Sequence, residues 1–310
     1  MVESHVETWY VLGAGSLGQL WAALLHRAGR PVCLILRSQA RLEEYRKARG
    51  ITLHEDYGEG RLMPPAVTSV GPTMRRVLIA TKAHQTTAAL EPFAALRDRS
   101  LTIAILQNGM GVAEEVQAAF PQACIYCLVT TTSGWRDAPF TMHRAGKGST
   151  LVGLHGPESR GCAVSAVARS LTVPGLEVEV SADIRPAQWR KLAVNCVINP
   201  LSALLEIRNG EVPTDARAKQ VLGDLCRELA TVASAEGVTL TAQEVLANIE
   251  ATCRVTASNY NSMLQDLRSG RRTEIDYLNG YVLARARAHG IACPANQTLY
   301  DDVKRREGRA

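Results

Sequence analysis

The sequence has few aromatic side chains for its size. Aromatic residues make up 5% of the 310 residues and only three are phenylalanine, whereas 46% of the chain is hydrophobic. A core of that composition must be built from Leu, Val, Ile and Ala, which is typical of α/β or helical proteins. The length suits one large domain or, in our interpretation, two.

A strong charge of one sign is also missing. Lys and Arg number 35 against 30 Asp and Glu, so the formal net charge is +5. The basic residues are scattered except in residues 304–309, which is weak support for nucleic-acid binding. A modest positive balance suits an anionic small-molecule ligand equally well.

Signals for membrane insertion, secretion and metal binding are weak. Residues 8–25 form an uncharged run of 18, but its three glycines favour a turn over a membrane span, and the acidic, polar start predicts no signal peptide. Cys124 and Cys127 form a C-x-x-C within an expected strand, with no second pair and no histidine at zinc spacing. We therefore expect no metal, reduced thiols and a cytoplasmic protein.

Two kinds of pattern divide the chain near residue 182. In the first part, short β-rich runs alternate with helical patterns, which predicts parallel β-α-β units. The later part has helical periodicity throughout. We expect a Rossmann-type dinucleotide-binding domain over residues 1–182, an all-helical domain over residues 183–310, and a ligand cleft between them. The expected strands are 9–12, 32–36, 51–54, 61–63, 77–80, 101–106 and 124–132, and the expected later helices are 186–206, 214–236, 241–268 and 273–289.

A G-x-G-x-x-G follows the first expected strand and opens a helix. The first glycine permits a tight turn, the second lets the backbone approach a pyrophosphate, and the third allows close helix–strand packing. The helix start then offers N–H groups to phosphate. An ordinary glycine-rich turn is the alternative. The loop consists of Gly13, Ala14, Gly15, Ser16, Leu17 and Gly18.

Three further polar residues follow expected strands. Arg37 stands where NAD-binding proteins place an acidic residue, and no carboxylate appears before Glu43. Its guanidinium can pair with a 2′-phosphate, which predicts NADP(H); a solvated surface arginine is the alternative. Lys82 and Asn108 follow two other strands. Because strand ends line the ligand crevice of such a sheet, we expect both near the glycine loop.

The most informative residues of the second half are Lys191, Asn195 and Asn199. They are spaced i, i+4, i+8 in an otherwise apolar helical stretch, so they share one face. An unpartnered buried amide costs about 1–3 kcal/mol, and a lone charge more. A fold tolerates such a row when an internal network or a ligand satisfies it, and we favour the ligand. Pro200 cannot donate to residue 196, which predicts a kink or break just past Asn199.

A second polar group lies in residues 259–277. Glu274 is expected either to cap the next helix with Thr273 or to face the cleft near Lys191. A Lys–Glu pair in a partly desolvated cleft can bind and polarise a carbonyl group. Asn209, in the loop after the first long helix, is a further candidate for the cleft.

These segments resemble the 2-dehydropantoate 2-reductase (ketopantoate reductase) family over nearly the whole chain, from about residue 11 to 306. The matching strings are G-A-G-S-L-G-Q-L-W at 13–21, T-K-A at 81–83, Q-N-G-M-G at 107–111, W-R-K-L-A-V-N-C-V-I-N-P-L at 189–201, S-M-L-Q-D at 262–266, T-E-I-D-Y-L-N-G at 273–280 and A-R-A-H-G-I at 286–291. This sequence departs from the family pattern at His84, where the family is expected to have an aromatic residue. The difference affects local packing.

The resemblance implies a fold, an activity and residue roles. The fold is α/β, with a Rossmann-type domain and a helical domain of the 6-phosphogluconate-dehydrogenase-like kind. The activity is NADPH-dependent reduction of 2-dehydropantoate to (R)-pantoate, on the route to pantothenate and coenzyme A. Lys191 and Glu274 would be catalytic, with Lys191 donating a proton to the ketone oxygen. The substrate would contact Asn108, Lys191, Asn195, Asn199, Asn209, Asn259 and Ser262, and NADPH would contact residues 13–18, Arg37, Lys82, Asn108, Gly134 and Glu274.

Two alternatives stay open. An NADP-dependent reductase of another branched 2-keto acid would share every one of these features. A non-catalytic NADPH-binding sensor would need the glycine loop but not Lys191 and Glu274, so their joint presence argues against it. We expect a monomer or homodimer.

Overall fold

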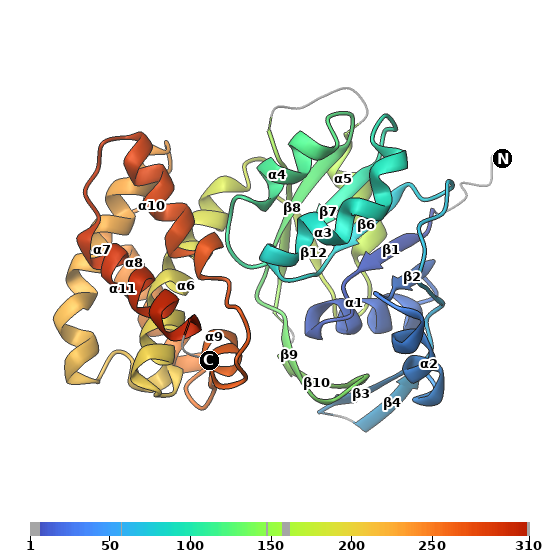
Figure 1. The fold of residues 1–310 in the computed structure, drawn as a ribbon, viewed down its shortest axis with the longest axis horizontal. Coiled ribbons are helices and arrows are strands. Elements are labelled where there is room, and N and C mark those ends of the chain that lie inside the picture. Colours follow the sequence, from blue (N-terminus) through green and yellow to red (C-terminus); the bar gives the residue numbers. More distant parts are fainter. Residues whose placement is uncertain (1–6, 57, 147, 157–161, 309–310) are drawn as a thin grey trace. The chain divides into compact units, whose positions relative to one another are not determined.

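The computed structural model describes residues 7–56, 58–146, 148–156 and 162–308. It divides into two compact units. The first comprises Met1–Gln107 and Val112–Ile184, and the second comprises Asn108–Gly111 and Arg185–Ala310. In Figure 1 the strands belong to the blue-to-green part of the chain, whereas the orange and red part is helical. The predicted fold class, a Rossmann-type α/β domain followed by a helical domain, is confirmed.

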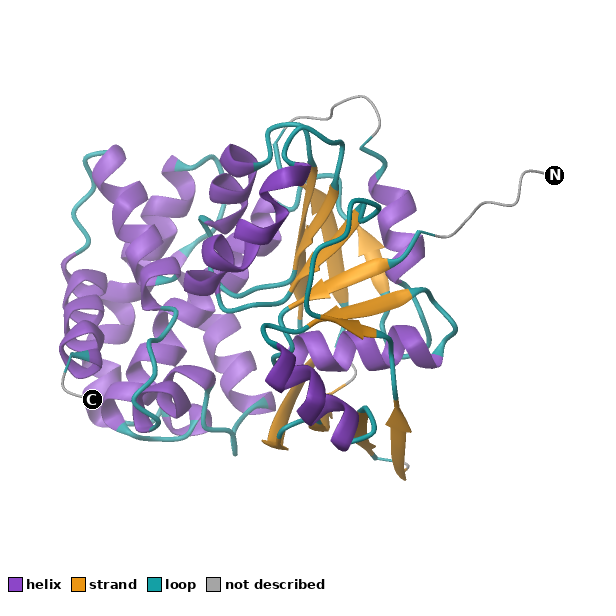
Figure 2. Cartoon of the chain, turned by 45° about the vertical axis from the view of Figure 1, so that its right-hand side comes forward, coloured by secondary structure: helices purple, strands orange, loops and turns teal. Residues whose placement is uncertain are grey.

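The main sheet of the first unit is eight-stranded and mostly parallel, with flanking helices (Figure 2). The strand order is β12-β11-β8-β7-β6-β1-β2-β5, and β11 runs antiparallel to β8. The strands are β1 (Trp9–Leu12), β2 (Val32–Ile35), β5 (Ala66–Val67), β6 (Arg76–Ile79), β7 (Thr102–Ile105), β8 (Cys124–Thr130), β11 (Thr150–Leu154) and β12 (Val178–Val180). The helices are α1 (Ser16–Arg27), α2 (Gln39–Lys47), α3 (Thr86–Leu90), α4 (Val112–Ala119) and α5 (Val164–Leu171), with 3-10 turns η1 (Ala83–Gln85) and η2 (Glu91–Leu96).

Helix α1 is the centre of the core of this unit. Leu20, Trp21 and Leu24 are at most 1% exposed and belong to one apolar cluster with residues of β1 and β2. Such a helix packs tightly on the sheet because Gly18 carries no side chain: a Cβ there would lie 1.9 Å from the Gly13 carbonyl oxygen. Close packing of α1 therefore fixes the loop between β1 and α1.

A second, four-stranded sheet was not predicted as a whole, although two of its strands were expected at 51–54 and 61–63. It has the order β4-β3-β10-β9 and comprises β3 (Ile51–Glu55), β4 (Gly58–Leu62), β9 (Ser133–Ala138) and β10 (Thr141–Gly146). The antiparallel β3–β4 pair is local, but β3 also pairs in parallel with β10, with Thr52 opposite Thr141. Pairing across so long a stretch of chain leaves no local pattern in the sequence.

The cysteines correct one expectation. Cys124 and Cys162 form a disulfide with a Cα–Cα distance of 5.5 Å, so not all thiols are reduced. The C-x-x-C itself does not form a disulfide, because Cys124 is bonded to Cys162 and Cys127 is a separate buried thiol three residues further along β8. No cluster of three or more His, Cys, Asp or Glu suited to a metal ion occurs among the described residues.

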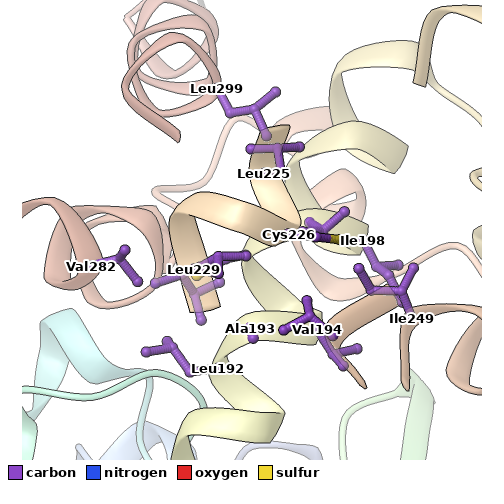
Figure 3. Packing of buried hydrophobic residues seen from close by; sticks show 14 of the residues in the cluster. Leu192, Ala193, Val194, Ile198, Leu225, Cys226, Leu229, Ile249, Val282 and Leu299 are labelled. Atoms are coloured by element: carbon purple, nitrogen blue, oxygen red, sulfur yellow. The ribbon is translucent and has the colours of Figure 1, made fainter. Parts of the chain in front are cut away.

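The second unit consists of helices around one apolar cluster. They are α6 (Arg185–Leu205), α7 (Ala216–Ala235), α8 (Ala242–Val255), α9 (Ser262–Arg268), α10 (Asn279–Ala288) and α11 (Pro294–Glu307), with 3-10 turns η3 (Asn209–Glu211) and η4 (Ile275–Tyr277). Figure 3 shows Leu192 and Ile198 of α6 packed among apolar side chains of the neighbouring helices, including Leu229, Ile249 and Val282. The described part of the chain contains no helix that is both long and apolar enough to cross a membrane. Of the basic stretch 304–309, Arg309 lies outside the described residues.

Two predicted helices are divided in the structure. The helix expected over 241–268 ends at Val255 and resumes at Ser262, where Asn261 caps α9 by accepting from the Leu264 N–H at 3.1 Å. The polar residues between the two helices favour turns and caps over helix interiors. The helix expected over 273–289 begins only at Asn279. The Tyr277 carbonyl accepts from the Met110 N–H at 2.9 Å instead of serving a helical ladder.

Candidate active site

The glycine loop has the geometry of an anion cradle. Gly13 has φ +107°, and a Cβ on it would lie 2.6 Å from the backbone nitrogen of Thr81. Gly15 is the N-cap of α1, where no side chain caps the helix start and no acidic residue lies in the first turn. The N-terminus of α1 therefore presents backbone N–H groups and a partial positive charge, which fits a pyrophosphate.

The ends of neighbouring strands lie at the same edge of the sheet as the glycine loop. Strands β7, β6, β1 and β2 are adjacent and parallel, so the segments after them meet at one edge, as predicted. Gln107 ties two of these segments together, since its Nε2 donates to the Thr81 carbonyl at 2.7 Å and to Thr86 Oγ1 at 2.6 Å. Arg37 is exposed just after β2, and Lys82 is half-buried at the start of η1. His84, the departure from the family, is half-buried within η1.

Strand β9 approaches the same loop. Arg136 Nη1 donates to the Ala14 carbonyl at 3.3 Å. Gly134 lies two residues earlier, and a Cβ there would be 2.6 Å from the His143 carbonyl oxygen of β10. Glycine is therefore required by the close β9–β10 pairing, and β9 brings this part of the chain to the glycine loop.

Asn108 leaves the first unit and belongs to the second. The Asn108–Gly111 segment clusters with the helical unit. Gly109 has φ +83°, and a Cβ on it would lie 2.4 Å from the Tyr277 carbonyl oxygen. The neighbouring Met110 N–H donates to that carbonyl at 2.9 Å. Asn108 is therefore held close to the segment that carries Glu274.

The polar row predicted on the long helix lies on α6 as expected. Lys191 and Asn195 are half-buried and Asn199 is 9% exposed, while Leu192, Ala193 and Ile198 are buried. Among the described residues, no side-chain hydrogen bond engages Asn195 or Asn199. The two amides are not satisfied by an internal network, which was the alternative to a ligand.

Of the kink or break predicted at Pro200, the break is wrong: α6 continues through Pro200 to Leu205. Proline cannot donate to the carbonyl of Cys196, and Asn279 Nδ2 donates to that oxygen instead, at 3.0 Å. Asn279 is fully buried and also donates to Asn296 Oδ1 at 3.0 Å. A side chain of α10 thus replaces the missing backbone hydrogen bond and keeps the polar row in register.

The pKa of Lys191 is lowered to about 8, because burial disfavours its charged form. The negative charge of Glu274 acts in the opposite direction and raises it. Burial therefore outweighs the carboxylate, a balance that sequence alone leaves undecided. A lysine with this pKa exchanges its proton near neutral pH, which is the property required of a general acid.

Glu274 does not act as a helix cap. It stands at the N-cap position of η4 but makes no side-chain capping hydrogen bond. Thr273 is fully buried and does not begin a helix. The structure thus supports the second expectation for Glu274, that of a carboxylate acting on Lys191.

Asn209, Asn259 and Ser262 lie together in the second unit. The Asn209 N–H donates to the Asn259 carbonyl at 3.0 Å, and its side chain bonds Thr256 Oγ1 at 3.1 Å and Asn261 Nδ2 at 3.2 Å. Asn209 is 7% exposed, whereas Asn259 and Ser262 are exposed. The Asn209 side chain therefore helps to hold this corner, and the side chains of Asn259 and Ser262 are exposed.

Sequence reasoning missed two residues that organise the site. Asn261 caps α9, and its Nδ2 reaches the Ile198 carbonyl of α6 at 3.4 Å. Asn279 supports α6 at Pro200. An asparagine directly before a helical run is a cap signal that identifies Asn261, whereas Asn279 carries no such local signal.

Comparison with known proteins gives one consistent family. A model described as ketopantoate reductase PanE/ApbA matches residues 9–157, and its C-terminal counterpart matches residues 183–307. The chain is 36% identical to the 2-dehydropantoate 2-reductase of Escherichia coli O157:H7 over 301 residues, which cover 96% of this chain and 94% of that protein. It is 32% identical to the enzyme of that name from Pyrococcus horikoshii, with 96% and 97% coverage.

Solved structures agree with this result. A D-mandelate dehydrogenase in a ternary structure with NADH and anilino(oxo)acetate has a TM-score of 0.89 at 26% identity, covering 97% of this chain and 99% of that chain. A PanE/ApbA family ketopantoate reductase from Ralstonia eutropha JMP134 has a TM-score of 0.86 at 28% identity, with the same coverage.

Proposed function

This chain belongs to the ketopantoate reductase family, and we propose that it reduces 2-dehydropantoate to (R)-pantoate with NADPH, with Lys191 as the proton donor. The reaction places the protein on the route to pantothenate and coenzyme A. The observation that carries the proposal is the polar row of α6: a lysine whose pKa is lowered to about 8, followed on the same face by two carboxamides. A binding module has no need of such a lysine, whereas a reductase does.

The proposed division of labour follows the two units. Residues 1–182 would make most of the cofactor contacts and residues 183–310 most of the substrate contacts, with Asn108 and Glu274 as the exceptions. NADP(H) would contact Gly13, Ala14, Gly15, Ser16, Leu17, Gly18, Arg37, Lys82, Asn108, Gly134 and Glu274. The substrate would contact Asn108, Lys191, Asn195, Asn199, Asn209, Asn259 and Ser262.

The chemistry follows from where charge develops. When bound, NADPH supplies a hydride to C2 of the keto acid, so negative charge develops on the ketone oxygen. An ammonium group aimed at that oxygen stabilises the transition state more than the ground state. Lys191 then transfers its proton to the oxygen, which completes the hydroxyl group.

The remaining residues of the row position the substrate. Asn195 and Asn199 can donate from their amide groups to the substrate carboxylate or hydroxyl oxygens. Glu274 favours the charged form of Lys191 and so keeps the proton available. Holding the keto group within reach of Lys191 converts an encounter in solution into an ordered reaction.

We also infer a cytoplasmic enzyme that is a monomer or a homodimer. Its proposed substrate and cofactor are both small anionic molecules, which accords with the positive net charge of +5. Sedimentation analysis of the purified protein distinguishes the two assembly states.

The experiment that tests this function is steady-state NADPH oxidation with 2-dehydropantoate, repeated with NADH and with a panel of other branched 2-keto acids. We expect the highest kcat/KM for 2-dehydropantoate with NADPH. A higher value for another keto acid identifies the alternative reductase, for which the likeness to a D-mandelate dehydrogenase is an argument. NADPH binding without turnover of any keto acid identifies a sensor and contradicts the proposal.

A further inference from the structure

The backbone on either side of Glu274 is held by the last helix of the chain. Thr273 is fully buried, and Glu307 of α11 accepts hydrogen bonds from its backbone N–H and its hydroxyl, both at 2.7 Å. The Thr273 hydroxyl oxygen in turn accepts from the Ile275 N–H at 3.2 Å. One carboxylate, 34 residues further along the chain, therefore fixes the residues that flank Glu274.

A second contact from α11 holds the other end of this segment. Tyr300 donates from its hydroxyl to Asp276 Oδ1 at 2.8 Å, and Lys304 Nζ lies 3.3 Å from Asp276 Oδ2. Arg272, from the segment itself, reaches the same Oδ2 at 2.7 Å. Before Asn279 the segment forms only the short 3-10 turn η4, so these side-chain bonds supplement its few backbone hydrogen bonds.

Glu307 is a mostly buried carboxylate whose charged form is stabilised. Its side chain is 10% exposed, and its second oxygen lies 2.8 Å from Lys304 Nζ. Burial raises the pKa of Glu307, but hydrogen bonds from Lys304 and Thr273 outweigh burial and lower it. A carboxylate held in this way is a strong acceptor for two buried donors.

The charged groups of this segment and of the elements that act on it come from three elements. Arg272 and Asp276 belong to its own segment, Lys304 and Glu307 to α11, and Lys191 to α6. Tyr300 is the remaining titratable group that contacts the segment from α11. Glu274 favours the charged form of Lys191.

We propose that Glu307 is a positioning residue for the reaction: by holding Thr273, it places the Glu274 carboxylate where it acts on Lys191. The inference rests on the proposed function, in which Lys191 donates the proton. It assigns the C-terminal helix a part in setting the protonation of the active-site lysine, although Glu307 contacts neither Lys191 nor the substrate in this scheme.

The test compares the titration of Lys191 in wild-type protein and in Glu307→Ala. The ¹³Cε NMR signal of Lys191, identified by its loss in Lys191→Ala, reports the titration without substrate or cofactor. In Glu307→Ala we expect the titration to move to lower pH, because Glu274 is no longer held beside the ammonium. We expect kcat with NADPH and 2-dehydropantoate to fall on the order of tenfold.

Three controls isolate the effect. Arg305→Ala changes an exposed residue of the same helix that pairs with Asp302, and it should leave both readouts unchanged. Glu307→Gln retains an acceptor for Thr273 and should restore most of the turnover. In a Glu274→Gln background, Glu307→Ala should cause no further shift, because the group through which Glu307 acts is already neutral.

The outcomes separate this inference from the proposed function. A lowered melting temperature with an unmoved Lys191 titration, or an equal shift in the Glu274→Gln background, overturns the role of Glu307. Wild-type turnover in Lys191→Ala overturns the proposed function instead. Should Glu307→Ala fail to fold, Thr273→Val removes the hydroxyl link while keeping the side-chain shape, and it must produce the same downward shift.

Discussion

We predict that Arg37 selects between the two nicotinamide cofactors. It is exposed directly after β2, and no acidic residue stands at this strand end. A charge-assisted bond to the 2′-phosphate contributes about 1.5–3 kcal/mol, which corresponds to roughly ten- to a hundredfold in affinity. Arg37→Ala is therefore expected to raise the Kd for NADPH by that factor and to leave the Kd for NADH almost unchanged.

Quenching of tryptophan fluorescence during cofactor titration measures both constants. Arg46→Ala removes an exposed arginine of α2 and serves as the control for a general loss of positive charge. Equal weakening of NADPH and NADH by Arg37→Ala would show that Arg37 contacts a part common to both cofactors.

At the scale of single elements, α6 is the helix on which the account depends. Its row of Lys191, Asn195 and Asn199 was predictable from the sequence, because residues spaced i, i+4 share a helix face. The continuation of α6 through Pro200 could not be predicted. The group that replaces the missing hydrogen bond is Asn279, which is 83 residues away from Cys196. Local patterns reveal a broken backbone bond but not the distant side chain that compensates for it.

This arrangement predicts the cost of removing Asn279. Asn279→Ala leaves the Cys196 carbonyl without a partner in the core, and we expect the free energy of unfolding to fall by about 1–3 kcal/mol. In a Pro200→Ala background the backbone N–H of residue 200 can bond that carbonyl again, so the same substitution should cost less. Urea unfolding of the four proteins measures the coupling. Equal costs in both backgrounds would exclude the proposed compensation.

At the scale of the whole molecule, the two units are not separated by a single boundary in the sequence. Residues Asn108–Gly111 lie in the sequence of the first unit but cluster with the second. The alternating pattern predicted the sheet and the strand-end edge, since these depend on short-range periodicity. It did not predict the excursion of Asn108 toward Tyr277, the sheet β4-β3-β10-β9 or the Cys124–Cys162 bond, because each depends on contacts between distant parts of the chain.

The excursion makes Gly109 a sensitive position. Its φ of +83° and its approach to the Tyr277 carbonyl both exclude a side chain. Gly109→Ala should displace Asn108 and lower kcat/KM for 2-dehydropantoate by roughly a hundredfold, the order of loss that an ångström-scale misplacement causes. Gly71→Ala is the matched control, since a Cβ there meets nothing within 4 Å. A normal kcat/KM in Gly109→Ala would show that Asn108 is not part of the active site.

The most direct measurement is the pH dependence of kcat/KM for 2-dehydropantoate with NADPH, in wild-type protein, in Lys191→Ala and in the exposed control Lys219→Ala. The pKa of Lys191 is lowered to about 8, and only the protonated amine can donate. The wild-type value should therefore be level below about pH 8 and fall above it. Lys191→Ala should be lower by ~10² or more and lose this decline, while Lys219→Ala should match wild type. Turnover of Lys191→Ala close to wild type, with the same decline above pH 8, would contradict the account.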